Sequence, residues 1–121
     1  MKVKIFILII ILLMLVGCKN SCSNSIVKSI SSPNGNYTAV AFIRDCGATT
    51  SFSPQVTLLK KGQKLNNSPG NVFIGNRSKF IDVQWENDNT LAITFNCSEK
   101  DIFKQEVNKY GINVTYKVLS Q

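Results

Sequence analysis

Four cysteines are the most reactive side chains of this 121-residue sequence: Cys18, Cys22, Cys46 and Cys97. The sequence has no histidine, which removes the usual general base of serine and cysteine nucleophiles and the commonest metal ligand. No pair of cysteines has the Cys-X-X-Cys spacing of a redox site, and no histidine is present to lower the pKa of a thiol. The cysteines therefore indicate covalent attachment and structural bonding rather than thiol catalysis.

Acidic side chains are the other groups with catalytic chemistry, and three of them lie near Trp85. Asp82 and Glu86 share one face of a predicted strand, and Asp88 lies in the turn that follows. Two carboxylates can perform glycoside hydrolysis, and several can bind Ca²⁺. The spacing matches no calcium loop, and no glycine-rich phosphate loop precedes a helix. We interpret these residues as solvated, and we expect no metal and no cofactor.

The start of the chain has the pattern of an export leader. Two early lysines are followed by an unbroken apolar run of 12 residues, Ile5 to Val16. This run is shorter than the roughly 17 residues that a bilayer span needs. The segment Leu15-Val16-Gly17-Cys18 resembles the lipobox of bacterial lipoproteins. The resemblance implies cleavage after Gly17 and acylation of Cys18 with fatty acids such as palmitate; an uncleaved membrane anchor is the alternative.

A lipidated Cys18 would hold the mature chain on a membrane of the cell envelope, because each buried acyl methylene contributes about 0.8 kcal/mol. In Gram-negative lipoproteins the next residue influences sorting. Lys19 is not Asp, so it favours the periplasmic side of the outer membrane in such a cell. In a Gram-positive cell the expected location is the cell surface.

Export makes disulfide formation the default for the remaining cysteines. With Cys18 assigned to lipid, three cysteines are left, which gives one bridge and one spare thiol. Cys46 and Cys97 each follow a predicted strand, whereas Cys22 lies in a short polar segment before the domain. We therefore predict a Cys46–Cys97 disulfide that closes a loop of about 50 residues and contributes about 4 kcal/mol, with Cys22 free.

The charge of the chain is moderately basic. It has 14 Lys and Arg against 7 Asp and Glu; removal of residues 1–17 takes two lysines, so the mature balance is 12 minus 7, or +5. The basic residues are scattered, and only two of them are arginine. A nucleic-acid interface would cluster them and favour arginine, so we expect no nucleic-acid partner.

The elements that must position these groups are strands. We assign residues 1–17 to a signal peptide, 18–25 to a lipidated flexible tether and 26–121 to one small domain. Short runs of β-branched and aromatic residues, bounded by Gly, Pro, Asn or Ser, predict strands. They cover residues 26–31, 37–44, 55–60, 71–74, 80–86, 90–96 and 111–119. Short connections favour antiparallel neighbours, and residues 99–109 fit one short helix or a further strand.

The loop between two of these strands, residues 45–53, is a candidate binding loop. It is rich in small hydroxyl residues, and Gly47 permits a tight conformation. The candidate binding residues are Asp45, Gly47, Thr49, Thr50 and Ser51. The alternative is a structural loop whose hydroxyls satisfy its own backbone.

Several segments of the sequence resemble known patterns. Ser32-Pro33-Asn34-Gly35-Asn36-Tyr37 resembles the turn of β-propeller repeats, although the 104 residues left after residue 17 are too few for a closed propeller. Together with Arg44-Asp45-Cys46-Gly47-Ala48-Thr49-Thr50, Ser53 to Val56 and the Trp85 strand, it resembles a family of small bacterial envelope proteins of unknown function, many of them lipoproteins. This resemblance implies a fold and a location but no activity.

We therefore expect an all-β or β-rich single domain of antiparallel meanders, blade-like or a sandwich, with at most one short helix near residues 99–109. The expected function is that of a lipid-anchored, non-enzymatic binding module with an envelope protein partner. One alternative is a small envelope enzyme, or an enzyme subunit, that uses the carboxylates near Trp85. Another is an inhibitor or immunity-type protein.

Overall fold

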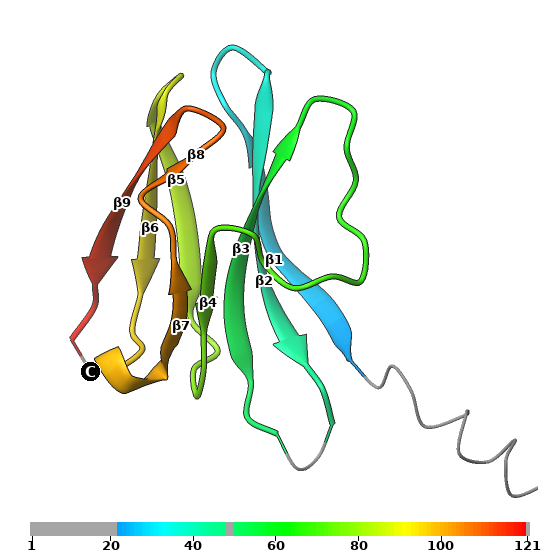
Figure 1. Ribbon diagram of the computed structural model, residues 1–121, viewed down its shortest axis with the longest axis vertical. Coiled ribbons are helices and arrows are strands. Elements are labelled where there is room, and N and C mark those ends of the chain that lie inside the picture. Colours follow the sequence, from blue (N-terminus) through cyan, green and yellow to red (C-terminus); the bar gives the residue numbers. More distant parts are fainter. Residues whose placement is uncertain (1–21, 48–49, 121) are drawn as a thin grey trace, which may run out of the picture.

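The apolar runs of the sequence form the strands of two β-sheets that face each other (Figure 1). A computed structural model describes residues 22–47 and 50–120. Across these residues the chain forms nine strands and one short 3₁₀ turn, which confirms the prediction of a β-rich domain. The elements are β1 (Ser23–Ser31), β2 (Tyr37–Asp45), β3 (Ser53–Lys60), β4 (Phe73–Gly75), β5 (Ile81–Asn87), β6 (Thr90–Phe95), η1 (Glu99–Asp101), β7 (Ile102–Gln105), β8 (Asn108–Lys109) and β9 (Ile112–Val118).

The first sheet has the order β1-β2-β3-β4-β7, and the second has the order β5-β6-β9-β8. Neighbouring strands are antiparallel except β6 and β9, which run parallel from Thr90 opposite Asn113 to Phe95 opposite Val118. This pair departs from the predicted antiparallel neighbours. The chain leaves the second sheet after β6, adds β7 to the first sheet and then returns, and so provides the long crossover that a parallel pair requires.

The main core lies between the two sheets, where alternate residues of each strand point inward. Ile81, Val83 and Trp85 of β5 are buried, while their neighbours along the strand are not. Phe73 of β4 packs against Phe95 of β6 with the ring centroids 5.0 Å apart. These contacts join the two sheets through apolar burial, the main favourable term in folding.

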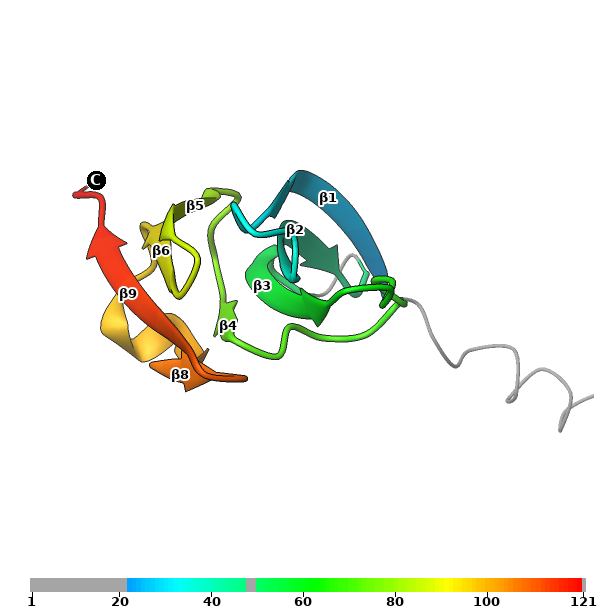
Figure 2. The same ribbon diagram turned by 90° about the horizontal axis from the view of Figure 1, so that it is seen from above.

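Side-chain contacts also join the edge strand β1 to β5 of the other sheet; Figure 2 shows these two strands from above. The indole Nε1 of Trp85 donates a hydrogen bond to the carbonyl oxygen of Ile30 at 2.9 Å. Nearby, the ammonium of Lys28 lies 3.2 Å from a carboxylate oxygen of Asp82. Trp85 therefore satisfies a carbonyl at the edge of the first sheet, where no further strand pairs with it.

The β1–β2 turn uses the side-chain oxygen of Asn34, an atom that aspartate would also provide at this position. The backbone N–H of Gly35 donates to the carbonyl of Ser32 at 2.8 Å, and Gly35 has a φ of 75°, which favours glycine. The Asn34 side-chain oxygen accepts hydrogen bonds from the Ser32 hydroxyl and from the Asn36 N–H. Only the oxygen is needed, and either residue type supplies it.

Of the two alternatives for residues 99–109, the structure has strands, β7 and β8, preceded by a single three-residue helical turn. In this turn, η1, the Asp101 N–H donates to the Ser98 carbonyl at 2.9 Å. The chain then continues as β7, because pairing with β4 uses the backbone groups that a longer helix would need. A two-residue turn with positive φ at Tyr110 and Gly111 joins β8 to β9.

The disulfide differs from the prediction: Cys46 is bonded to Cys22, and Cys97 is free and buried. The prediction of a Cys46–Cys97 bridge was therefore wrong. The reason is the extent of β1, which begins at Ser23 and pairs that residue with Asp45. Residues 23–25, assigned above to a tether, thus belong to the sheet, and Cys22 lies opposite Cys46 at the open end of the β1–β2 hairpin.

The predicted leader, the lipidation residue Cys18 and the loop residue Thr49 lie outside the described residues. The described part of the chain has no helix that is long and apolar enough to span a membrane.

Candidate functional site

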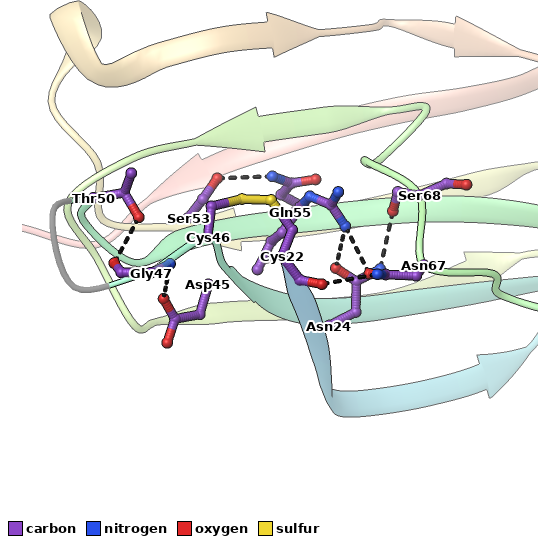
Figure 3. Close-up of a disulfide and its surroundings, with 11 residues drawn as sticks. Cys22, Asn24, Asp45, Cys46, Gly47, Thr50, Ser53, Gln55, Asn67 and Ser68 are labelled. Atoms are coloured by element: carbon purple, nitrogen blue, oxygen red, sulfur yellow. Dashed lines mark hydrogen bonds between the residues drawn. A yellow bond between two sulfur atoms is a disulfide. The ribbon is translucent and has the colours of Figure 1, made fainter. Parts of the chain in front are cut away.

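The disulfide lies beside a network of polar side chains that joins three segments of the chain (Figure 3). One guanidinium nitrogen of Arg44, Nη1, donates to the side-chain oxygens of Asn24 at 2.8 Å and Asn67 at 3.1 Å. The Asn67 amide in turn donates to the carbonyl of Cys22, and the Asn24 amide donates to that of Ser68. These bonds hold the 61–71 loop against the start of β1 and fix the position of Arg44.

A groove with a volume of about 510 Å³ adjoins this network on the outer face of the first sheet. Arg44 and Ser53 are opposite each other in the β2–β3 register, so their side chains share that face. Polar side chains line one part of the groove, and apolar atoms make up most of its exposed surface. The polar lining residues are Arg44, Thr50, Ser51, Ser53, Gln55 and Asn76, and the apolar ones are Pro69, Ile74 and Phe103.

Internal hydrogen bonds fix the floor of the groove. The buried Gln55 donates from Nε2 to the Ser53 hydroxyl at 2.8 Å and accepts from the Gly70 N–H at 2.7 Å. The Ser53 hydroxyl donates to the carbonyl of Gly75 at 2.5 Å. Gln55 therefore links β3 to the 61–71 loop, and its polar atoms are satisfied despite burial.

Arg44 differs from these floor residues, because part of its hydrogen-bonding capacity is unused. Its Nη1 makes the two bonds to asparagine, and Nε and Nη2 make none to the described residues. No carboxylate in the described part of the chain lies within ion-pair distance of Arg44. The half-buried groove thus contains a fixed positive charge without a counter-ion.

The predicted binding loop is partly held by hydrogen bonds between its own residues. Asp45 accepts a hydrogen bond from the Gly47 N–H at 3.0 Å, and both the N–H and the hydroxyl of Thr50 donate to the Gly47 carbonyl. Gly47 has a φ of 118°, which favours glycine. These polar atoms bond within the loop itself, while both Thr50 and the exposed Ser51 line the groove.

Sequence reasoning missed Arg44, Gln55 and Asn76 as groove residues. The alternation of side chains along β2 and β3 could have indicated Arg44 and Gln55, since these two residues and Ser53 lie on one face of the sheet once the strands are paired. Asn76 follows β4 in the chain, and only the tertiary fold brings it to the groove.

The carboxylates near Trp85 do not form a joint site. Asp82 pairs with Lys28, and Glu86 lies four residues further along β5, a rise of about 13 Å. Asp88 lies in the following turn, where one side-chain oxygen is buried without a hydrogen-bond partner among the described residues. Among residues 22–47 and 50–120, no cluster of three metal-binding side chains occurs.

Cys97, the free cysteine, is a buried core residue. Burial raises the pKa of its thiol, the charge of Asp101 raises it further, and a backbone hydrogen bond from Asn76 partly opposes both effects. A thiol with a raised pKa is a poor nucleophile at neutral pH. Cys97 therefore acts as a small apolar side chain in the core.

The fold and the groove define a small two-sheet β domain with one disulfide and a surface groove beside Arg44. The chain matches a family of unknown function, DUF5412, over residues 1–110, and it belongs to that family. The matched region includes strands β1 to β8 and the residues before them. Comparison with curated proteins and with solved structures gave no match.

Proposed function

We propose that this protein is a lipid-anchored binding module of the bacterial envelope, and that it binds an acidic group of an envelope protein in the groove beside Arg44. The observation that carries this proposal is the Arg44 guanidinium, which two asparagines hold in a groove without a carboxylate partner among the described residues. The proposal includes no chemical reaction.

The envelope location is supported by the leader and by the disulfide. The leader resembles that of lipoproteins up to Cys18. Disulfides persist in oxidising compartments outside the cytosol, and the Cys22–Cys46 bond lies only four residues further along the chain. Export and lipidation of Cys18 account for both features.

The ligand chemistry follows from the groups that line the groove. A guanidinium presents planar N–H donors that match a carboxylate, and the Nε and Nη2 donors of Arg44 are unused. The Ser51 hydroxyl and the Asn76 amide provide further polar groups, while Ile74 and Phe103 provide an apolar wall. A side-chain or C-terminal carboxylate beside an apolar residue fits this combination.

The groove favours binding over catalysis. Its described lining includes no carboxylate, and the chain has no histidine, so nothing in the groove can act as a general base near neutral pH. An inhibitor or immunity-type protein would use such a groove in the same way, since it acts by occupying one partner. An enzyme that uses the carboxylates near Trp85 would have to bring them together with groups that they do not contact here.

Capture from crosslinked cells tests the proposal. Arg44→Gln should weaken capture of the native partner by about tenfold or more, because loss of one desolvated charge pair costs at least about 2 kcal/mol. Arg77→Gln is the matched control, since Arg77 is the other arginine of the chain and is exposed outside the groove. Arg44→Lys should recover only part of the capture, because lysine keeps the charge but not the planar donors. Equal capture by the Arg44→Gln and Arg77→Gln variants would contradict the proposal.

A further inference from the structure

One end of the molecule exposes several large apolar side chains. We define this disulfide end as residues 46–53, 76–80, 96–103 and 118–119 where they are described. These segments lie together, because the Ser78 N–H donates to the Phe52 carbonyl, Gly75 pairs with Ile102, and Phe95 pairs with Val118. In Figure 1 it is the lower end, where β2, β6 and β9 end and where the chain enters β1. Its exposed apolar residues are Phe52, Phe80, Phe103, Val118 and Leu119.

The proposed lipid anchor would keep this end close to the membrane. Three residues lie between Cys18 and Cys22, and the four residue steps of a fully extended chain span at most about 14 Å. The bond between Cys22 and Cys46 then fixes the loop after β2 at the same place. This step rests on the proposed function, because it requires a lipid on Cys18.

The charges of the disulfide end nearly cancel. Its described cations are Arg77, Lys79 and Lys100, and its anions are Glu99 and Asp101, so its net charge is 3 minus 2, or +1. Arg77 and Asp101 are 3.8 Å apart, and the Lys79 ammonium lies 4.1 Å from the centre of the Phe52 ring. Aromatic rings beside lysine are typical of the headgroup level of a bilayer. Contact with lipid would therefore depend on aromatic burial more than on anionic lipid.

We propose that the disulfide end lies on the bilayer surface and inserts Phe52, Phe80 and Phe103 at headgroup level. The acyl chains and the aromatic residues then act as two linked attachments to the bilayer. The short connection between them keeps the aromatic residues at a high effective concentration near the bilayer surface. Phe103 also borders the Arg44 groove, so the groove opens close to the membrane and its partner is bound there.

Tryptophan reporters in the full lipidated chain test this orientation. Phe103→Trp and Val107→Trp form a matched pair, since the native side chains are 65% and 70% exposed and lie before and after the end of β7. The chain is reconstituted into phosphatidylcholine vesicles that contain lipid brominated near the headgroup. Wild-type protein corrects for Trp85, which is only 9% exposed. Bromolipid should quench most of the emission added by Phe103→Trp and little of that added by Val107→Trp, and high salt should change neither result.

Vesicle flotation of the same samples separates this inference from the proposed function. Protein that does not float carries no lipid anchor, and that result would overturn both the anchor and the orientation derived from it. Floating protein in which neither reporter is quenched, or in which Val107→Trp is quenched more, would overturn the orientation alone. Floating protein whose Phe103→Trp emission is protected from both bromolipid and aqueous iodide would assign the end to a protein contact instead.

Discussion

Cys22 is bonded to Cys46, so the residue before β1 is covalently joined to the residue after β2. The two strands are antiparallel neighbours that pair from Ser23 opposite Asp45 to Ser31 opposite Thr38. The disulfide therefore closes the open end of a hairpin whose other end is the Ser32–Gly35 turn. It also fixes the edge strand at the point where the chain enters the domain.

Removal of this disulfide should destabilise the domain. For a closed loop of 24 residues, the chain-entropy model gives a loss of about 3 kcal/mol in the free energy of unfolding. Chemical denaturation of the Cys22→Ala/Cys46→Ala variant against wild type measures the loss.

Non-reducing peptide mapping of the wild-type protein should recover Cys22 and Cys46 in one linked peptide, and Cys97 should become alkylatable only after unfolding. A linked peptide that contains Cys97 would contradict this arrangement.

Trp85→Phe should remove the hydrogen bond between the two sheets while keeping most of the apolar burial. The Ile30 carbonyl would lose its donor, and an unsatisfied polar group of this kind costs about 1–3 kcal/mol. Tyr37→Phe is the control, because its exposed hydroxyl makes a longer bond of 3.3 Å to the Tyr110 carbonyl. Thermal or chemical unfolding should show the larger loss for Trp85→Phe. A larger loss for Tyr37→Phe would show that the Trp85 bond contributes little.

Gly75→Ala should destabilise the core through a steric clash with Cys97. A Cβ at position 75 would lie 2.6 Å from the Cys97 sulfur and 3.2 Å from the Phe73 ring. Overpacking of this kind costs about 1–3 kcal/mol. Cys97→Ala removes the sulfur, so the double variant should lose less stability than the sum of the two single variants. Strict additivity in this cycle would show that the two residues do not interact.

The stability of the domain should fall at alkaline pH. Burial raises the pKa of the Cys97 thiol above its ordinary 9.0, and burial together with the charge of Glu106 raises that of Tyr116 above its ordinary 10.0. The folded protein therefore keeps protons that the unfolded chain releases, and the free energy of unfolding decreases as the pH rises above about 9. Below that pH both states are protonated, and these groups produce no slope.

Urea unfolding of wild type and Cys97→Ala at neutral pH and at about pH 10 measures this dependence. The Cys97→Ala variant should lose less stability between the two pH values. In the Tyr116→Phe variant, the decrease in stability that Cys97 causes near pH 9 should remain, and the further decrease at higher pH should be absent. This variant also loses the hydrogen bond from the Tyr116 hydroxyl to the Glu106 carbonyl. If both variants lose as much stability as wild type between the two pH values, other groups cause the loss of stability at alkaline pH.

Much of the fold could be predicted because most strands are short runs of β-branched and aromatic residues that can be recognised in the sequence itself. The alternation from Ile112 to Val118 predicted the last strand, although its buried face extends only as far as Val114, with Tyr116 half-buried and Val118 exposed. The start of β1 could not be predicted, since Ser23, Asn24 and Ser25 have no strand propensity. Pairing with Arg44 and Asp45 places them in the sheet.

The candidate site was predicted only in part. The loop after β2 was predicted as a binding loop from its composition, and the structure places Ser51 in the groove lining. Arg44 was missed because its role depends on Asn67, which is far away in the sequence and reaches it only when the 61–71 loop folds over the sheet. The disulfide partner was missed for a related reason, since the choice of Cys22 depends on the register of β1 rather than on spacing alone.

Metabolic labelling with a fatty-acid analogue, combined with membrane fractionation, tests the central claim of lipid anchoring most directly. Cys18→Ala removes the proposed lipidation residue, and Cys22→Ser is the matched control at the neighbouring cysteine of the described domain. Wild type and Cys22→Ser should incorporate the label and fractionate with membranes, whereas Cys18→Ala should do neither. Label retained by Cys18→Ala, or absent from wild type, would contradict the account.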